Sequence, residues 1–315
     1  MTEQKSVSHL ETPIDMGLVN DFMEDCRLRG YSPETIRSHR SNLRTIAKFL
    51  NNHMMSFTDV DKTVLRETLD YLRNERKVSQ KTLENYFSAL SSFYEYMVYT
   101  NLHSVNPVSS FRKRYLKTYK KGHASPRRRL LSVEDMSLLI NGVLEIRDKA
   151  IMTVLAKTGI RRGELLAIDV EDVDWKDNSI KLKRSSPYVF FDEETAIILG
   201  RWLGVRESYA IREKKALFVG EQGKRIGRNI VYGLVTRHAE RLGFHDPDSD
   251  SMEDHFSPKC FRQWFTTHLR WSGLSREFLR ELRGASREKI EISDRIDLDE
   301  LRHAYLAAIP RLEII

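Results

Sequence analysis

Apolar residues between positions 13 and 105 recur every three to four positions, the spacing of helices that bury one face. Helix starts are expected at three places: Ser32-Pro33, Asp59 or Asp61, and Ser79. Serine and aspartate cap the first turn of a helix, and proline is favoured at its first position. The pattern predicts a small bundle of four helices, which Asn106-Pro107 closes.

The pattern changes after residue 131, where short β-type segments separate two groups of helices. Helices are expected over 147–157, 193–205, 228–242, 258–272, 275–282 and 299–309. Strands are expected over 173–175, 180–182 and 188–191, with a further short strand over 216–219. Gly159 follows the first of these helices and suits a C-cap that requires a positive φ. The fold class predicted is mainly α with a small antiparallel β-sheet.

A basic stretch separates the two patterns. Nine lysines and arginines lie close together there: Arg112, Lys113, Arg114, Lys117, Lys120, Lys121, Arg127, Arg128 and Arg129. The chain therefore divides into a disordered N-terminus (1–12), a helical domain (13–108), a basic linker (109–130) and a second domain (131–315). The linker is either a solvated connection or a strap that crosses a nucleic-acid backbone.

Composition narrows the class of protein. A net charge of +7 and a pI of about 9.2 favour a polyanionic partner. Apolar runs are too short for a membrane span, and the first residues lack the apolar core of a signal peptide. Cys26 and Cys260 form no metal-ligand or disulfide pattern. Neither a metal nor another cofactor is expected. The expected location is the cytoplasm.

Two arginine-containing segments carry the candidate chemistry. They read Thr158-Gly159-Ile160-Arg161-Arg162-Gly163-Glu164-Leu165-Leu166 and Ser257-Pro258-Lys259-Cys260-Phe261-Arg262-Gln263-Trp264-Phe265-Thr266-Thr267-His268-Leu269. Each resembles one arginine box of the tyrosine recombinases, the phage-integrase and Xer-type family, here of the archaeal or viral type. The N-terminal phrases "RGYSPETIRSHRSNLRTIAKFL" and "SQKTLENYFSALSSFYEYMV" resemble the SAM-like core-binding domain of the same family. The resemblance covers roughly residues 15–310.

The resemblance implies a two-domain clamp around double-stranded DNA and a metal-free phosphoryl transfer. Arg161 and Arg262 would hold the scissile phosphate, and Glu164 would orient Arg161. Lys183 would be the general acid, with Arg184 and Lys181 as alternatives. In the helical domain Arg40, Arg44 and Lys81 would contact DNA, as would the basic residues of the linker. A dimer or tetramer on DNA, associated with the nucleoid, is the implied assembly.

Three positions depart from the family pattern. Lys259 stands where the second box usually begins with histidine, and Ala285 where histidine or tryptophan is usual. Ser293, or Asp294 when counted from Gly284-Ala285, occupies the slot of the nucleophilic tyrosine. Neither is a tyrosine, and the aliphatic hydroxyl of Ser293 is much less acidic than a phenol. Tyr305 is expected to pack rather than to replace that nucleophile, and neither His268 nor His303 is expected to join the site.

Two functions follow as hypotheses. The first is site-specific DNA recombination. The alternative is a catalytically inactive relative, a pseudoenzyme with an architectural or regulatory role in DNA binding. Ser293 is either natural or an engineered change, or a partner protomer supplies the tyrosine.

Overall fold

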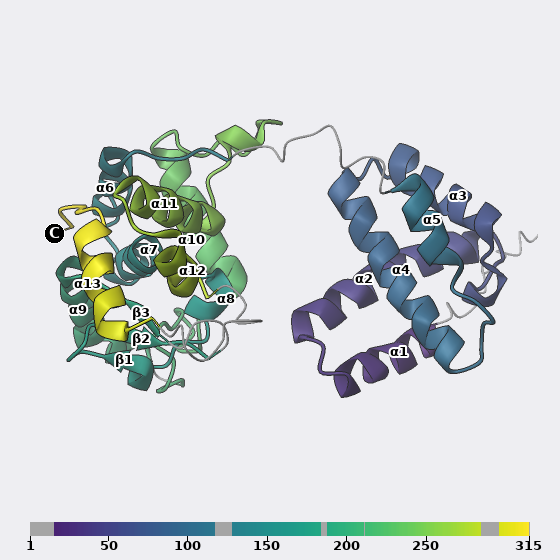
Figure 1. Cartoon of the computed structure of the whole chain (residues 1–315), viewed down its shortest axis with the longest axis horizontal. Helices are drawn as coiled ribbons and strands as arrows, with labels where there is room; N and C mark the ends of the chain where they lie inside the picture. Colours follow the sequence, from purple (N-terminus) through teal and green to yellow (C-terminus); the bar gives the residue numbers. More distant parts are fainter. Residues whose placement is uncertain (1–15, 117–127, 184–187, 211, 285–295, 315) are drawn as a thin grey trace, which may run out of the picture. The chain divides into compact units, whose positions relative to one another are not determined.

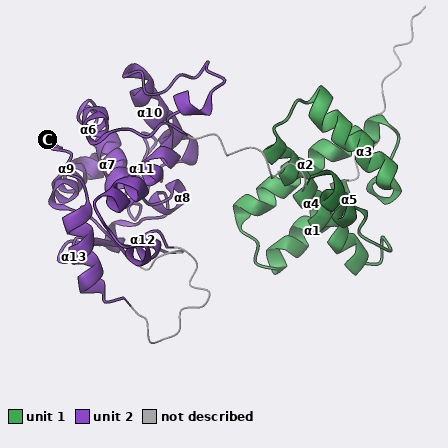
Figure 2. Cartoon of the chain, turned by 45° about the horizontal axis from the view of Figure 1, so that its top comes forward, with its two compact units in different colours: residues 1–123 green, residues 124–315 purple. Residues whose placement is uncertain are grey.

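The computed structural model describes residues 16–116, 128–183, 188–210, 212–284 and 296–314. The chain forms two compact units, residues 1–123 and residues 124–315, shown in different colours in Figure 2. The expected disordered N-terminus, residues 1–12, lies outside the described residues. Each unit has a hydrophobic core of its own.

Unit 1 is helical, and its helices begin at the capping residues expected from the sequence. The helices are α1 (Met16–Leu28), α2 (Pro33–Asn52), α3 (Lys62–Asp70), α4 (Gln80–Tyr99) and α5 (Pro107–Tyr115) (Figure 1). The Ser32 and Ser79 side chains accept hydrogen bonds from the amides of the third helical residues. Asp61 caps α3 in the same way. The three predicted helix starts are therefore confirmed.

Helix α5 corrects the expected end of the bundle. Asn106 does not close the unit but caps a further helix, since its side chain accepts from the Val108 amide at 2.9 Å. Phe111 of this helix is buried and stacks on Phe87 with ring centroids 5.4 Å apart. The apolar residues at Val108, Phe111 and Leu116 anchor α5 in the core of unit 1. Residues 109–115 of the expected basic linker are thus part of a packed helix.

Unit 2 is built around α7 (Ile146–Thr158), in which nearly every residue is buried. Helices α6 (Val133–Asn141), α9 (Glu193–Tyr209), α10 (Arg228–Arg241) and α11 (Pro258–Trp271) contact it (Figure 1). The remaining helices are α8 (Arg162–Leu165), α12 (Arg276–Leu282) and α13 (Leu298–Ala308). The helices expected in this unit are all present, with bounds shifted by a few residues.

A small antiparallel sheet lies beside these helices. Its strands are β1 (Val173–Asp174), β2 (Ser179–Lys181) and β3 (Tyr188–Phe190), in the order β1-β2-β3. Ile180 pairs with Val173 on one side and with Val189 on the other. The strand expected over 216–219 is replaced by isolated bridges, Asp169 with Ala216 and Val219 with Arg225.

The last described residues fold back onto the centre of unit 2. The amides of Leu312 and Ile314 donate to the carboxylate of Glu194 at 3.0 and 3.2 Å. Glu194 in turn receives the ammonium of Lys157, a residue of α7 with no exposed surface. The same ammonium bonds Asp192 at 2.6 Å and the Pro310 carbonyl at 2.8 Å. One buried lysine therefore connects α7, the start of α9 and the C-terminal segment.

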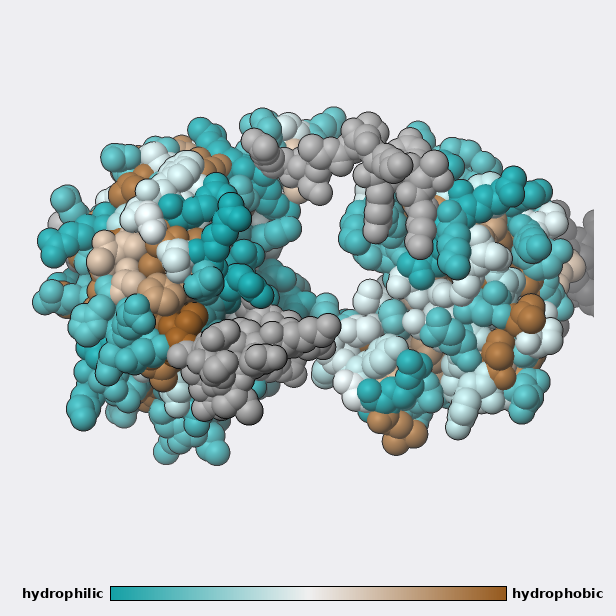
Figure 3. All heavy atoms as spheres, in the orientation of Figure 1, coloured by the Kyte–Doolittle hydropathy of each residue, from teal (hydrophilic) through white to brown (hydrophobic). Residues whose placement is uncertain are grey.

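The surface is mainly hydrophilic on the face shown in Figure 3, with scattered hydrophobic residues. Within the part of the chain that the structure describes, no helix combines the length and apolarity that crossing a bilayer requires.

Candidate functional site

The site begins where α7 ends. Gly159 is the C-cap of α7 with φ of 59°, as the sequence predicts, and its amide bonds the Leu155 carbonyl at 3.1 Å. A Cβ at this glycine would lie 2.4 Å from the Phe265 ring, so α11 approaches the backbone closely here. The chain then turns into α8, with Arg161 as its N-cap. This turn fixes the position of Arg161 relative to α11.

Arg161 is oriented by Glu164. One carboxylate oxygen accepts from the Arg161 amide at 2.6 Å, and the other accepts from its guanidinium at 2.9 Å. The side chain of Glu164 is 9% exposed, whereas that of Arg161 is 50% exposed. The acid thus lies beneath the arginine and leaves part of the guanidinium open to solvent, in agreement with the predicted role of Glu164.

Arg262 lies on α11 and is held by two backbone carbonyls. Its Nη1 donates to Gly159 at 2.8 Å and its Nη2 donates to Arg283 at 2.7 Å. Burial, together with the charges of Arg161 and Arg283, lowers the pKa of Arg262 to about 10, and Glu164 opposes this change. The guanidinium remains protonated at neutral pH. Because Arg262 binds the carbonyl of Gly159, two residues before Arg161, the two predicted arginines belong to the same part of unit 2.

Neighbouring guanidiniums favour an anion between them. Each offers a planar fork of charge-assisted donors that matches a phosphate. Carbonyl groups and Glu164 hold these donors before any ligand arrives, so little reorganisation is needed when negative charge develops. The arrangement suits binding of a phosphodiester and stabilisation of a phosphorane.

Lys183 is placed on a different carboxylate. It lies directly after β2, and its ammonium donates to Asp169 at 2.5 Å, with Asp172 at 3.9 Å. The Asp169 hydrogen bond raises the pKa of Lys183 above its usual value, with a smaller opposing effect of burial. Arg184, one of the alternatives, lies outside the described residues, and Lys181 is exposed on β2.

Of the three positions that depart from the family pattern, the structure describes only that of Lys259. Lys259 is exposed in the first turn of α11. It precedes Arg262 by three residues, a spacing that puts two side chains on one face of a helix. Ser293 and Ala285 lie outside the described residues, which stop at Gly284 and resume at Ile296.

Tyr305 has the packing role expected of it. It is fully buried on α13, and its hydroxyl donates to the Lys157 carbonyl at 2.8 Å. Burial raises the pKa of this phenol well above its usual value. His268 is buried with Nε2 at 3.1 Å from the Leu131 carbonyl, and His303 is exposed on α13. None of the three side chains is placed with the arginines by these contacts.

The predicted DNA-contact residues of unit 1 lie on neighbouring exposed surfaces. Arg40 and Arg44 are exposed one turn apart on α2, and Lys81 is exposed at the start of α4. The Asn42 side chain donates to the Asn85 carbonyl at 3.3 Å, which joins the two helices at this face. Lys113 and Arg114 are exposed and Arg112 is half-buried, all in the last turn of α5.

The remaining basic residues of the expected linker fall into two groups: four lie outside the described residues, and two contact other segments of unit 2. Lys117, Lys120, Lys121 and Arg127 lie outside the described residues. Arg128 donates to the Ser257 hydroxyl at 2.9 Å, and Arg129 donates to the Gly243 carbonyl at 3.0 Å. The guanidinium of Arg129 also lies over the Phe244 ring, 5.5 Å from its centroid. These two arginines therefore connect the first residues of unit 2 to other segments of the same unit.

The structure adds charged residues that the sequence did not point to. Asp169 and Arg225 form an ion pair beside Lys183, and Arg225 also donates to the carbonyls of Leu166 and Ile168 at 3.0 and 3.1 Å. Arg162 is half-buried and lies over the Tyr232 ring of α10. A single aspartate or arginine between elements carries no sequence signal, so only the fold reveals these contacts.

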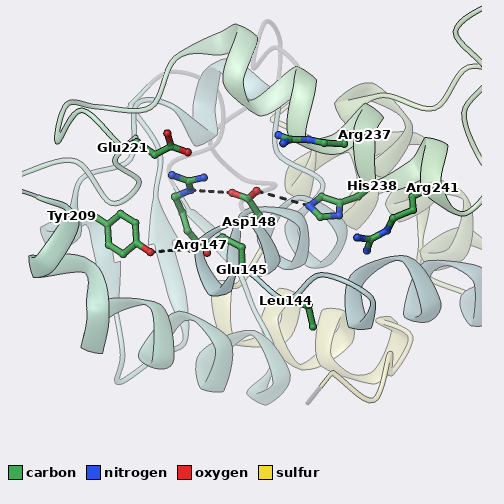
Figure 4. Close-up of a pocket in the computed structure, with 9 residues that line it drawn as sticks. All are labelled: Leu144, Glu145, Arg147, Asp148, Tyr209, Glu221, Arg237, His238 and Arg241. Atoms are coloured by element: carbon green, nitrogen blue, oxygen red, sulfur yellow. Dashed lines mark hydrogen bonds and ion pairs between the residues drawn. The ribbon is translucent and has the colours of Figure 1, made fainter.

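A cavity of about 540 Å³ lies at the other end of α7 (Figure 4). Asp148 is buried in its wall between Arg147, whose Nε is 2.9 Å away, and His238 at 3.9 Å. Burial alone would raise the pKa of Asp148, but the hydrogen bonds and charges of His238 and Arg147 lower it below its usual value. The ion pair therefore stabilises the folded state in its charged form.

Asp148→Asn is expected to lower the free energy of unfolding by about 1–2 kcal/mol at neutral pH, because Arg147 loses a charge-assisted partner. Since the folded pKa of Asp148 is depressed, its contribution is complete above the ordinary aspartate pKa and disappears as the pH falls through the folded value. Urea unfolding across this range measures the difference, with the exposed Asp248→Asn as control. A difference that does not shrink in acid would contradict the assignment.

Both units match known families. Residues 129–305 match the phage integrase family, and residues 18–104 match the phage integrase N-terminal SAM-like domain. A relative is the tyrosine recombinase XerC of Psychromonas ingrahamii, 28% identical over 90% of this chain and 92% of that protein. The XerC of Vibrio vulnificus is 26% identical over 95% of this chain and 94% of its own length.

Solved structures share the fold. The XerH recombinase bound to a palindromic difH substrate aligns with a TM-score of 0.63 and 18% identity, over 91% of this chain and 80% of that chain. A lambda integrase dimer bound to a COC' core site aligns with a TM-score of 0.62 and 16% identity, over 88% and 98% of the two chains. With the family match spanning more than half of its residues, the chain belongs to the phage integrase family of tyrosine recombinases.

Proposed function

We propose that this protein binds double-stranded DNA and acts in site-specific recombination, with one DNA phosphate held between Arg161 and Arg262. The observation that carries this proposal is the second guanidinium. Arg262 is half-buried and fixed by two carbonyls, one of which belongs to Gly159, two residues before Arg161. Glu164 offsets part of the repulsion between the two guanidiniums. A bound phosphodiester, the anion that this family handles, would offset more of it.

The roles of the other residues follow from the same arrangement. Lys259 supplies a further cation beside the phosphate, and Lys183 supplies the proton for the leaving oxygen. Arg40, Arg44, Lys81 and the basic end of α5 supply contacts to the DNA backbone, as do Lys117, Lys120, Lys121 and Arg127. Binding as a dimer or tetramer is part of the proposal, because a lambda integrase of the same fold is described as a dimer on its core site.

This chain differs from the family pattern at the position expected for the nucleophilic tyrosine. The segment 285–295 reads Ala-Ser-Arg-Glu-Lys-Ile-Glu-Ile-Ser-Asp-Arg and contains no tyrosine. Tyr305 donates its hydroxyl to a buried carbonyl and has a raised pKa, both of which oppose attack on a phosphate. Ser293→Tyr is therefore the variant that restores the residue type of the family at the expected position.

We expect Ser293→Tyr to form a covalent adduct with nicked duplexes of randomised core sequence, visible on a denaturing gel. Adding Arg262→Ala to this variant should slow adduct formation by about 100-fold or more, the usual cost of removing one preorganised donor. Duplex binding by the double variant should fall far less, because one phosphate contact among many is lost. Sequencing of the captured DNA would identify the preferred site.

Arg270→Ala is the matched control, since Arg270 is exposed on the same helix and lies in its last turn. It should leave the adduct rate unchanged. If neither the wild type nor Ser293→Tyr forms an adduct while both bind DNA, the cleavage half of the proposal is wrong and a DNA-binding role without cleavage remains. If the wild type shows no salt-dependent DNA binding, the proposal as a whole is wrong. An adduct of the wild type that disappears on Tyr305→Phe would overturn the assignment of the nucleophile slot.

A further inference from the structure

Lys183 and Asp169 are joined by a contact that the proposed reaction does not need. The lysine follows β2, whereas the aspartate lies in the turn after α8, eight residues after Arg161. Their hydrogen bond is 2.5 Å long and is part of a cluster that contains one more acid and one more base. The acid is Asp172, 3.9 Å from the ammonium, and the base is Arg225.

Asp169 is anchored independently of Lys183. One of its carboxylate oxygens accepts from Arg225, and only the other accepts from the lysine. Its amide donates to Asp172 at 2.8 Å, and its backbone forms a bridge with Ala216. The Asp169 side chain is 10% exposed, and Arg225 also bonds the carbonyls of Leu166 and Ile168. If Lys183 leaves, the buried carboxylate still has a cationic partner.

Lys183 itself is free to move at small cost. Its side chain is 51% exposed, so leaving the aspartate does not strand a buried charge. A surface ion pair of this kind contributes little to stability. The contact is therefore weak enough to be exchanged for a phosphate oxygen, which is also an anionic acceptor.

The contact also makes Lys183 a poorer proton donor. A general acid works best when its pKa is near the pH of the reaction. The hydrogen bond to Asp169 raises the pKa of Lys183, against smaller opposing effects of burial and of the Arg225 charge. An ammonium bonded to this carboxylate therefore has to be released before it can donate a proton to a leaving oxygen.

We infer that Asp169 is a positioning residue that binds the Lys183 ammonium in the DNA-free protein and keeps it from acting as a proton donor. A DNA phosphate then displaces Asp169 from the lysine. This inference rests on the proposed function for the role of Lys183. The contact with Asp169 stands on the geometry alone. Arg225 has a complementary role, because its ion pair keeps Asp169 in place and compensated when the lysine has left.

Competitive acylation of lysines, followed by mass spectrometry, tests the inference. An acylating reagent reacts with the unprotonated amine, so the rate at fixed pH reports the pKa and accessibility of each lysine. Lys181 is exposed on β2, two residues before Lys183, and serves as the internal reference. We expect Lys183 to react several-fold more slowly than Lys181 in the wild type, and Asp169→Asn to remove most of this difference.

Two further variants distinguish a specific restraint of Lys183 by Asp169 from a general structural role of Asp169. Asp169→Glu should restore slow labelling of Lys183, and Asp172→Asn should change it little because Asp172 is the more distant acid. The urea midpoint of each variant reports any loss of stability. If Asp169→Asn lowers the midpoint but leaves the Lys183-to-Lys181 ratio unchanged, Asp169 is structural only and the inference is wrong.

Labelling in the presence of a nicked duplex pool tests displacement. In the wild type, bound DNA should change the reactivity of Lys183 relative to Lys181. The Asp169→Asn variant should show the same Lys183 reactivity as the wild type when both are bound to DNA. An unchanged ratio with DNA bound would overturn the displacement by phosphate. A protein that binds no DNA would contradict the proposed function, whereas the comparison of DNA-free variants would still decide whether Asp169 holds Lys183.

Discussion

Gly159→Ala is expected to lower the free energy of unfolding by about 3–4 kcal/mol. A left-handed backbone costs an L residue about 1–2 kcal/mol, and Gly159 has φ of 59°. The new Cβ would also lie 2.4 Å from Cδ1 and 2.6 Å from Cγ of Phe265, a buried ring of α11. Overpacking of this kind adds about 1–3 kcal/mol. Urea unfolding of the purified variant measures the sum.

The same substitution should impair the site as well as the fold. Relief of the clash requires α11 to move away from the end of α7, and Arg262 on α11 donates to the Gly159 carbonyl. Gly163→Ala is the matched control, because a Cβ at this exposed helical glycine would meet no atom within 4 Å and its φ is not positive. It should be neutral or stabilising by about 0.4–1 kcal/mol. Equal effects of the two alanines would show that the contact with Phe265 does not constrain the turn.

Lys157→Met is expected to cost about 3–5 kcal/mol of unfolding free energy, the usual effect of removing one partner from a buried ion pair. The ammonium has no exposed surface and bonds Asp192, Glu194 and the Pro310 carbonyl. Methionine fills similar space but leaves both carboxylates without their cation. Amide hydrogen exchange at Leu312 and Ile314 should also accelerate, because Glu194 accepts both amides.

The cost of Lys157→Met should depend on pH. Burial alone would raise the pKa of Glu194, but the hydrogen bonds from Lys157 and from the Leu312 amide lower it below its usual value. The stabilisation is therefore complete above the ordinary glutamate pKa and is lost as the pH falls through the folded value. The deficit of the variant should shrink in acid. Lys176→Met, at an exposed lysine, is the control and should stay within about 0.5 kcal/mol of wild type at all pH values.

The fold was predictable from the sequence where local signals and burial agree. The helix that begins at Ser32-Pro33 has a capping serine, a proline at its first position and an apolar stripe, and all three favour the same start. Residues 216–219 show the opposite case. Their apolar character reflects burial against neighbouring segments, but they form only isolated bridges instead of a strand. Helix α5 was missed because its basic last turn conceals the two buried apolar residues within the helix itself, Val108 and Phe111.

The candidate site was predictable only in part, for a related reason. Arg161, Glu164 and Arg262 stand in local contexts that the resemblance identifies. The structure joins Arg161 to Glu164, and Arg262 to the carbonyl of Gly159 just before Arg161. The partners of Lys183, Asp169 and Asp172, come from the turn after α8, and Asp169 is itself paired with Arg225 from a further loop. Such long-range ion pairs depend on how elements pack. No periodicity or motif in a single sequence encodes them.

Arg262 connects three segments that lie far apart in the chain. Its two described hydrogen bonds join α11 to the carbonyl of Gly159 and to that of Arg283, just before the segment with the nucleophile slot. Truncating this side chain would therefore remove two hydrogen bonds to the backbone together with the phosphate ligand proposed above. Energies of residues that share partners do not add. The loss of phosphate affinity measured for an Arg262 variant is an upper bound on the strength of the guanidinium–phosphate contact itself.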